Sequence, residues 1–318
     1  MIPTERNDLH PASRLWVLLC LAFLTLLPGP VAHGDDSVLV IGAVHADSAT
    51  ARQRLAPMAS YVAAQLADVG IEQVLIVVAP DTASLIDLLR YERVDWVAET
   101  AFNALTIEET GLAEMVARTW RRGTPSYRSL FVVRRDSAID DLRDLNGAAV
   151  AFERELSTSA FFVPAVELLE NEHTLCRLGG PRQAVASHCV GFAFSNRPYN
   201  TAMWVHKGVA QAGVLSSDDW ASTEAVPTTL RDDLRVLLAS DDVPRGIELL
   251  RIGLDPAVRE RLLDVMLTMH TNSDADAALN AYFQTRRIDL LDQKDQERLD
   301  VLRAALPRFR AQVGMLRQ

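Results

Sequence analysis

The chain has 318 residues, a length that predicts about two domains. Hydrophobic residues make up 49% of it and charged residues 23%, a balance that excludes wholesale disorder. Asp and Glu (42) outnumber Lys and Arg (32), and a net charge of −10 offers no general surface for nucleic acid. We therefore expect no nucleic-acid partner, and an anionic ligand would need local donors.

Common catalytic and metal-binding signatures are missing from the sequence. It contains no G-x-G-x-x-G, no P-loop, no G-x-S-x-G elbow and no H-E-x-x-H, and its seven histidines lack metal-ligand spacing. We therefore expect no catalytic residues, no metal site and no cofactor.

The first predicted element is a targeting segment. Arg14 is followed by an uncharged apolar run, Leu15–Leu27, whose 13 residues are fewer than the roughly 20 that span a bilayer. Pro28-Gly29-Pro30 ends the run, and Ala32-His33-Gly34 supplies small residues for cleavage. These features predict a signal peptide over residues 1–34, cleaved near Gly34, and an exported chain of 284 residues. The alternative is an uncleaved membrane anchor.

The exported chain begins with a β-α-β-α-β pattern. Short runs rich in Val and Ile predict buried strands over Val38–Gly42, Val74–Ala79 and Val94–Ala98. Between them, apolar residues at helical spacing predict helices over Arg52–Asp68 and Thr82–Arg90. This alternation indicates parallel strands joined by right-handed crossovers.

A second α/β unit follows an extended connection at Tyr127–Arg134. The same criteria predict its elements in this order: the strand Ala148–Phe152, a helix to Glu170, the strands Thr174–Leu178 and Val190–Ser195, a helix to Gly208, and the strand Ala212–Ser216. The exported chain thus contains two α/β units.

Two cysteines lie in this second unit. Cys20 leaves with the signal peptide, so Cys176 and Cys189 remain, each at the end of a predicted strand. Export to an oxidising compartment makes a disulfide between them possible. The alternative is two buried free thiols, because the sequence does not give the Cα separation that a disulfide requires.

The last part of the chain is predicted to be extended through Arg235–Leu238 and then helical, without further sheet. The predicted helices are Asp255–His270, Asp274–Phe283 and Gln293–Gln312, and Pro307 should kink or interrupt the last. We expect them to pack on the first unit. The resulting domains are a first lobe (35–126), a crossing strand with the second lobe (127–222), and a return crossing with C-terminal helices (223–318). A cleft between two such lobes suits ligand capture by hinge closure.

Three consecutive hydroxyl residues, Ser157-Thr158-Ser159, follow the strand Ala148–Phe152 and open the helix to Glu170. A helix N-terminus supplies free N–H groups and the positive end of a dipole. Together with three hydroxyls, these groups can hold a tetrahedral oxyanion without a positive charge. The other interpretation is ordinary helix capping, since Ser and Thr are common N-caps.

The order Ala151-Phe152, Ser157-Thr158-Ser159 and Pro164 resembles a motif of the phosphate/phosphite/phosphonate-binding proteins of ABC transporters. These proteins are type II periplasmic binding proteins. Further segments resemble the family in the same order along the chain: Tyr127-Arg128-Ser129, Val132-Val133-Arg134, Asp136-Ser137, Asp141-Leu142, Asp144-Leu145-Asn146-Gly147, Ala202–Gly208, Ala212-Gly213-Val214, Val243-Pro244 and Leu254–Met269. The resemblance therefore covers nearly the whole exported chain.

Three positions depart from the family pattern. Ala160 stands where the family has a glycine, Asn196–Asn200, which includes Pro198, lacks the family histidine, and Gln211 replaces an acidic residue. In the family, the histidine and acidic positions concern the substituent beyond the oxyanion. The departures therefore leave the particular ligand open.

The resemblance implies a two-lobed type II fold and a periplasmic solute-binding protein that delivers a phosphonate-, phosphite- or phosphate-like anion to an ABC permease. It implies that Ser157, Thr158 and Ser159 hold the oxyanion and that Tyr127 donates from the hinge. Strand-end loops add four candidate ligand residues: Glu99, Thr100, Asn200 and Thr201. We expect a monomer. Two alternatives are an exported protein that serves a sensor kinase, and an enzyme on the same fold.

Overall fold

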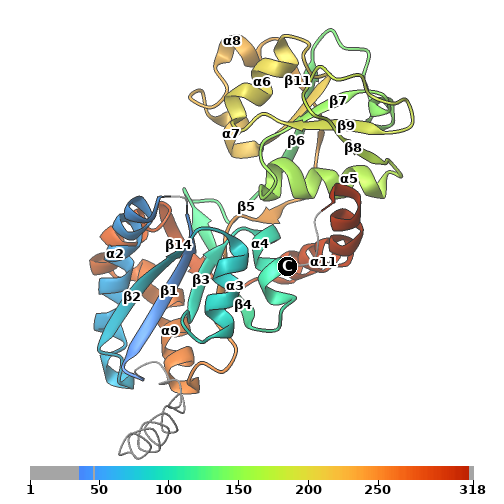
Figure 1. Cartoon of the computed structure of the whole chain (residues 1–318). Helices are drawn as coiled ribbons and strands as arrows, with labels where there is room; N and C mark the ends of the chain where they lie inside the picture. The colour runs from blue at the N-terminus through green and yellow to red at the C-terminus, as the bar shows by residue number, and fades with distance from the viewer. Residues whose placement is uncertain (1–35, 46, 315–318) are drawn as a thin grey trace, which may run out of the picture. The chain divides into compact units, whose positions relative to one another are not determined.

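The first lobe is built on a six-stranded sheet in the order β14-β4-β13-β3-β1-β2 (Figure 1). The computed structural model describes residues 36–45 and 47–314, so the predicted signal peptide lies outside the described residues. The parallel strands of this sheet are β1 (Val38–Val44), β2 (Gln73–Ala79) and β3 (Trp96–Glu99). They are connected by α2 (Ser48–Gln65) and α3 (Thr82–Arg90), which confirms the predicted β-α-β-α-β unit.

Three further strands complete this sheet, and none of them was predicted. β13 (Ile247–Arg251) lies antiparallel between β3 and β4 (Ala113–Arg121), and β14 (Thr285–Asp289) pairs antiparallel with β4. The expectation that no sheet follows Leu238 was therefore wrong. Charged residues such as Glu248 interrupt the apolar pattern of these strands, although Glu248 itself is fully buried.

A second six-stranded sheet forms the other lobe, in the order β11-β6-β10-β7-β9-β8. Its parallel strands are β7 (Ala149–Phe152), β8 (Leu175–Arg177), β9 (Val190–Phe194) and β10 (Ala212–Ser216). β6 (Ser129–Arg134) is antiparallel to β10, and β11 (Leu234–Ala239) is antiparallel to β6. Because β11 belongs to this sheet, the return crossing begins after Ala239, later than the expected residue 223.

The second lobe also contains several short helices. The hydroxyl triplet opens η3 (Thr158–Phe162), a π-helical turn that continues directly into α5 (Val163–Glu170). The others are α6 (Pro198–His206), α7 (Ser217–Ala221) and α8 (Thr228–Arg231). Short 3₁₀ turns occur in the two lobes at Ala67–Val69, Leu142–Leu145, Met269–Thr271 and Ser273–Ala275.

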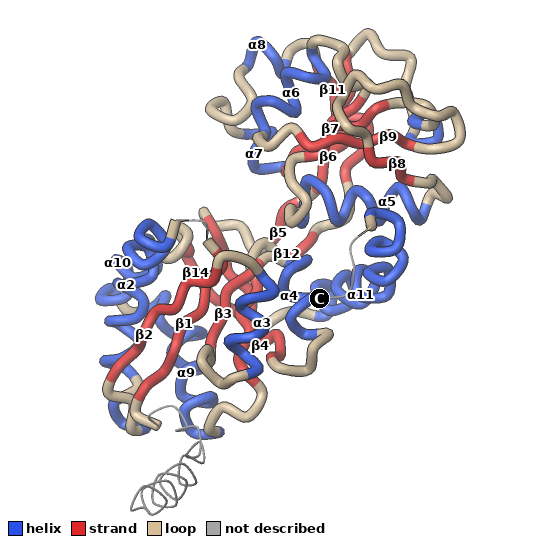
Figure 2. Tube along the Cα trace, viewed as in Figure 1, coloured by secondary structure: helices blue, strands red, loops and turns tan. Residues whose placement is uncertain are grey.

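The two crossings between the sheets pair with each other. β5 (Ser126–Tyr127) and β12 (Val243–Pro244) form a two-stranded antiparallel ribbon, with Val243 opposite Tyr127 (Figure 2). The predicted crossing residue Tyr127 therefore lies at the point where both connections between the lobes run side by side.

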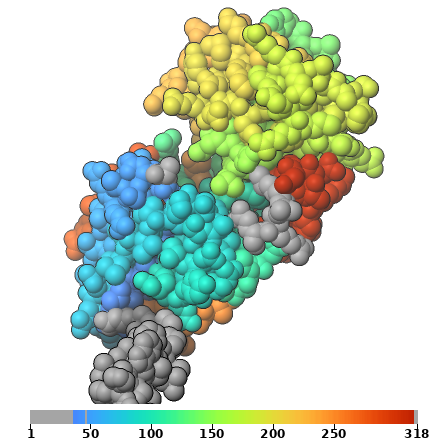
Figure 3. All heavy atoms as spheres, in the orientation of Figure 1, coloured from blue at the N-terminus to red at the C-terminus, as the bar shows by residue number. Residues whose placement is uncertain are grey.

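The C-terminal helices pack on both lobes rather than on the first alone. α9 (Pro256–Thr268) and α10 (Asp276–Ala281) lie on the first lobe, and α11 (Gln293–Val313) continues through Pro307 without ending there. Arg298 of α11 pairs with Glu167 of α5 over 2.8 Å, and Figure 3 shows the C-terminal helix in red against the second lobe. Phe309 of α11 contacts Phe102 of α4 (Ala101–Glu108) and Phe162 of η3. α11 therefore connects the two lobes beside the crossings.

The interior of each lobe is apolar, as the strand patterns predict. Phe152, Phe161, Phe162, Phe192 and Phe309 are all fully buried, and their rings form a chain of tilted and edge-on contacts. Among the described residues, no helix has the length and hydrophobicity needed to cross a bilayer.

Candidate functional site

The predicted ligand residues lie at the carboxyl-terminal edges of the parallel strands, where open α/β sheets bind ligands. In the first lobe, β3 ends at Glu99 and the unpredicted β4 ends at Arg121. In the second lobe, β7 ends at Phe152, a few residues before the hydroxyl triplet. The amide of Phe102, at the start of α4, donates to Thr158 Oγ1 over 2.9 Å, so the two edges meet directly.

Only one member of the triplet caps the helix. Ser157 is the N-cap of η3, and its Oγ accepts a hydrogen bond from the amide of Ala160 over 3.2 Å. Thr158 and Ser159 are both buried. Ala160 has φ −109°, outside the left-handed region, so this chain does not need the family glycine there. The Ser157 hydroxyl is therefore used for capping, whereas the Ser159 hydroxyl makes no capping bond.

Tyr127 lies against this triplet. Its side chain is buried, and burial raises the pKa of the phenol, while the Arg245 charge and the nearby Ser159 hydroxyl oppose the rise. The phenol therefore stays protonated at neutral pH and can donate a hydrogen bond. Thr158 and Arg121 also lie close enough to act on this pKa. The structure thus brings Tyr127, Thr158 and Ser159 together, as the resemblance implies.

Two arginines that the sequence analysis did not single out adjoin Tyr127. The Arg245 guanidinium lies 5.0 Å from the centre of the Tyr127 ring and pairs with Asp218 over 2.9 Å. Arg121 lies over the Phe283 ring, 4.3 Å from its centre. In the sequence, Arg245 could have been noticed only because it directly follows Val243-Pro244, a segment that resembles the family. No motif in the sequence marks Arg121, which pairs with Thr285 of β14.

Glu99 and Thr100 stand at the first-lobe edge of the site. Glu99 accepts hydrogen bonds from Asn103 Nδ2 over 3.0 Å and from the Thr100 amide over 3.3 Å. Burial raises the pKa of Glu99, while the Asn103 bond and the Arg121 charge oppose that rise. Thr100 is the N-cap of α4, without a side-chain capping bond. Glu99 therefore already has partners in the protein, and its carboxylate faces Arg121.

Asn200 and Thr201 are engaged within the second lobe. Asn200 Nδ2 donates to the Ser195 carbonyl over 2.8 Å, and Thr201 Oγ1 lies 2.6 Å from Ser195 Oγ. Thr201 is fully buried, and its methyl group packs on Gly213. These contacts fix the turn between β9 and α6, and they do not bring either residue into contact with Tyr127 or Ser159.

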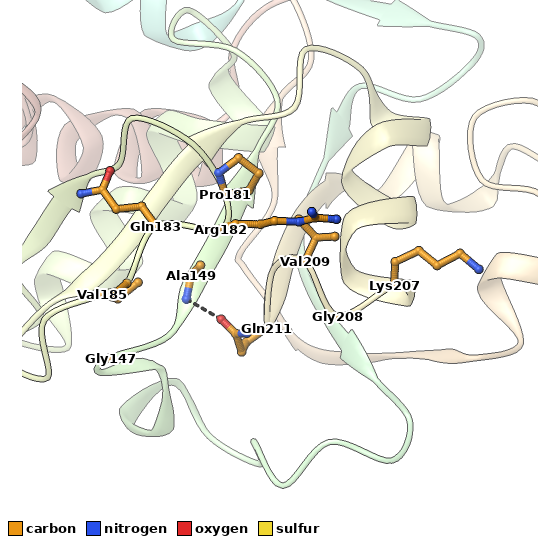
Figure 4. Close-up of a pocket in the computed structure, with 11 residues that line it drawn as sticks. Gly147, Ala149, Pro181, Arg182, Gln183, Val185, Lys207, Gly208, Val209 and Gln211 are labelled. Carbon is orange, nitrogen blue, oxygen red and sulfur yellow. Dashed lines mark hydrogen bonds between the residues drawn. The ribbon is translucent and has the colours of Figure 1, made fainter.

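A hollow of about 460 Å³ lies at the opposite, amino-terminal edge of the second sheet. Its lining includes Gly147, Arg182 and Lys207, together with Gln211, one of the departures from the family pattern. Figure 4 shows the Gln211 side chain directed at β7, where its Oε1 accepts from the Ala149 amide over 2.8 Å. The Gln211 position is therefore remote from the hydroxyl triplet, and the hollow contains none of the predicted ligand residues.

Cys176 and Cys189 form a disulfide, with their Cα atoms 6.0 Å apart. It joins Cys176 in β8 to Cys189, the residue directly before the parallel neighbour β9. His188 lies beside the two sulfurs, but sulfurs joined in a disulfide are not thiolate ligands. Among residues 36–45 and 47–314 no other His, Cys or carboxylate group has metal-site spacing.

Comparisons with known proteins identify the family. The family model described as "ABC transporter, phosphonate, periplasmic substrate-binding protein" matches residues 41–295. The chain belongs to this family. It is a periplasmic substrate-binding protein of an ABC transporter.

The chain is also similar in fold to solved structures. XAC2383 from Xanthomonas citri, solved bound to ATP, is 35% identical, with a TM-score of 0.80 over 87% of this chain and 99% of that one. PhnD1 from Prochlorococcus marinus, in complex with methylphosphonate, is 15% identical, with a TM-score of 0.59 over 89% of this chain and 100% of that one. At that identity the likeness concerns the fold alone, which is that of the type II periplasmic binding proteins.

Proposed function

We propose that this phosphonate-family protein is exported by a signal peptide cleaved near Gly34 and binds a tetrahedral phosphorus oxyanion as a monomer. The oxyanion accepts hydrogen bonds from Ser159 and Tyr127, with Ser157 and Thr158 completing the helix N-terminus around it. The bound anion is then delivered to an ABC permease without covalent chemistry.

The observation that carries this proposal is the convergence of Tyr127 on Ser159 beside two guanidinium groups. Neutral hydroxyl donors alone hold an anion weakly, whereas charge-assisted bonds to Arg are roughly twice as strong as neutral ones. The net charge of −10 is thus overcome locally rather than across the surface.

The ligands of the solved relatives support the chemical class. XAC2383 was solved with ATP and PhnD1 with methylphosphonate, and both ligands carry tetrahedral phosphorus oxyanions. The site in this chain offers donors and positive charge for such a group. Its other candidate residues, Asn200 and Thr201, shape the adjoining turn.

A thermal-shift panel tests the proposal. Phosphate, phosphite, methylphosphonate, an aminoalkylphosphonate, diphosphate and ATP are compared with sulfate and an alkylsulfonate on the exported protein. A ligand at 100 times its Kd adds about 2.7 kcal/mol to the free energy of unfolding. The Tm should then rise by at least about 2–4 °C for a protein of this size. A shift with a sulfonate and with no phosphorus anion would contradict the proposal.

A further inference from the structure

Arg121 lies close to the short connection between β12 and β13, which consists of Arg245 and Gly246. Arg245 follows the return crossing, where its amide donates to the Pro125 carbonyl over 2.9 Å, and Gly246 comes next. A Cβ atom at Gly246 would lie 2.9 Å from both Nε and Nη2 of Arg121, and 2.2 Å from Thr119 Oγ1. Only glycine leaves room for the Arg121 guanidinium here. The two arginines are therefore held side by side, next to Tyr127.

A strained turn orients Arg121 from the other side. Phe283 and Gln284 are consecutive non-glycine residues with φ of 55° and 57°, in the left-handed region that such residues rarely adopt. This turn places the Phe283 ring under the Arg121 guanidinium. Strain of this kind persists where the surrounding structure requires it, and it concentrates at ligand-binding sites. The turn is therefore consistent with a guanidinium held ready for a ligand.

Both arginines keep unused hydrogen-bonding capacity. The Nε–H groups of Arg121 and Arg245 are buried and without a hydrogen-bond partner. No ion pair involves Arg121 in the described part of the chain, whereas Arg245 pairs with Asp218. A buried donor without a partner is unfavourable, so two of them at one position call for an acceptor.

The two glutamates near this pair accept hydrogen bonds from other donors, although Glu248 Oε1 is buried without a partner. Glu99 accepts from Asn103, and Glu248 Oε2 accepts from Trp96 Nε1 over 2.6 Å and from the Tyr282 hydroxyl over 2.9 Å. Burial raises the pKa of both glutamates, so they neutralise Arg121 incompletely. Arg121 therefore retains positive charge, whereas the charge of Arg245 is shared with Asp218.

We propose that Arg121 and Arg245 form a second anion subsite beside the Tyr127 and Ser159 hydroxyls, and that the ligand carries two linked phosphoryl groups. The inference rests on the proposed function, because the first phosphoryl group occupies the hydroxyl site. Arginine forks bind phosphoryl oxygens in a bidentate manner, which a single alkylphosphonate cannot exploit at both places. Free diphosphate and the diphosphate of a nucleotide share this chemistry.

Calorimetric titration of the exported protein with phosphate, methylphosphonate, diphosphate and ADP tests the subsite. The wild-type protein should bind diphosphate at least about tenfold more tightly than phosphate, since a charged hydrogen bond contributes about 10- to 100-fold in affinity. Equal affinity for diphosphate and ADP would identify the phosphoryl pair as the recognised group. Preference for ADP would identify a nucleotide as the source of that pair.

Variants separate the subsite from the oxyanion site. Arg121→Gln and Arg245→Gln should each reduce the ratio of diphosphate to phosphate affinity by at least about tenfold. Arg54→Gln, which removes an exposed charge from α2, should leave the ratio unchanged. Circular dichroism and a urea melt establish that each variant is folded, and Arg245→Lys supplies a milder change if Arg245→Gln is not.

Two failures have different meanings. If phosphate or methylphosphonate binds and the arginine variants lower all affinities equally, the second subsite is refuted while the proposed function stands. If no phosphorus anion binds the wild-type protein, the proposed function fails, and the subsite fails with it.

Discussion

The backbone N–H of Phe102 donates a hydrogen bond to Thr158 Oγ1 over 2.9 Å, and this bond joins the start of α4 in the first lobe to the hydroxyl triplet in the second. Both residues are buried. The oxygen of Thr158 thus accepts a bond between the lobes, while its O–H group can still donate to a ligand.

Thr158→Val tests this relationship. The substitution keeps the branched shape but leaves the Phe102 amide buried without an acceptor, which should lower the free energy of unfolding by about 1–3 kcal/mol. Thr158→Ser retains the hydroxyl and should remain near the wild-type value. Urea denaturation measures both, and wild-type stability in the valine variant would show that the bond between the lobes contributes little.

Tyr127→Phe should weaken anion binding with little effect on the fold. It removes the phenol donor and keeps the ring against which Arg245 lies. We expect about 10- to 100-fold lower affinity in calorimetric titration. Tyr91→Phe, at a position that is 73% exposed, is the matched control and should bind normally. Equal affinity of Tyr127→Phe and wild type would remove Tyr127 from the ligand set.

Glu248 should make stability depend on pH. Burial raises the pKa of this carboxyl from its ordinary 4.5 to about 7, against the opposing bonds from Trp96 and Tyr282. The folded protein therefore binds more protons than the unfolded chain between pH 4.5 and 7, and the contribution of Glu248 to stability falls as the pH rises through that window.

Glu248→Gln isolates this contribution. A glutamine oxygen can still accept from Trp96 and Tyr282 but does not ionise. The variant should match the wild type near pH 5 and exceed it at pH 8 by on the order of 3 kcal/mol, from about 1.4 kcal/mol per pKa unit. Urea melts at the two pH values measure the difference, and parallel curves for the two proteins would contradict the assignment.

The Cys176–Cys189 bridge should leave the exported protein without free thiols. Alkylation under denaturing, non-reducing conditions should label no cysteine of the mature chain, and two labelled cysteines would exclude the bridge. The cysteines are separated by 13 residues, and in the chain-entropy model closing a loop of this length stabilises the fold by about 3 kcal/mol. A melt of the reduced protein should show a loss of that order.

The sequence predicted those elements whose pattern is local. Val38–Gly42 and Thr82–Arg90 correspond to β1 and α3 because continuous apolar runs and helical spacing need no knowledge of partners. β13 was not predicted because Glu248 interrupts its apolar run. The carboxyl of Glu248 is buried only because β13 pairs with β3 and β4. Pro307 was expected to disturb α11, yet the helix continues through it.

The part of the site that lies in family-like motifs could be predicted from the sequence. Ser157-Thr158-Ser159 and Tyr127 came from matches along the chain, and the structure brings them together. Arg121 could not be found in this way, because its place depends on the pairing of β4 with β14 and on the small size of Gly246. Asn200 and Thr201 have suitable donors, but their bonds to Ser195 become evident only in three dimensions.

A crystal structure of the exported protein with the phosphorus anion that gives the largest thermal shift tests the central claim most directly. The account predicts the phosphorus group at the carboxyl-terminal strand edges, with its oxygens in hydrogen-bonding distance of the hydroxyls of Tyr127 and Ser159. An anion bound instead in the hollow lined by Arg182 and Lys207, with the Tyr127 site empty, would contradict it.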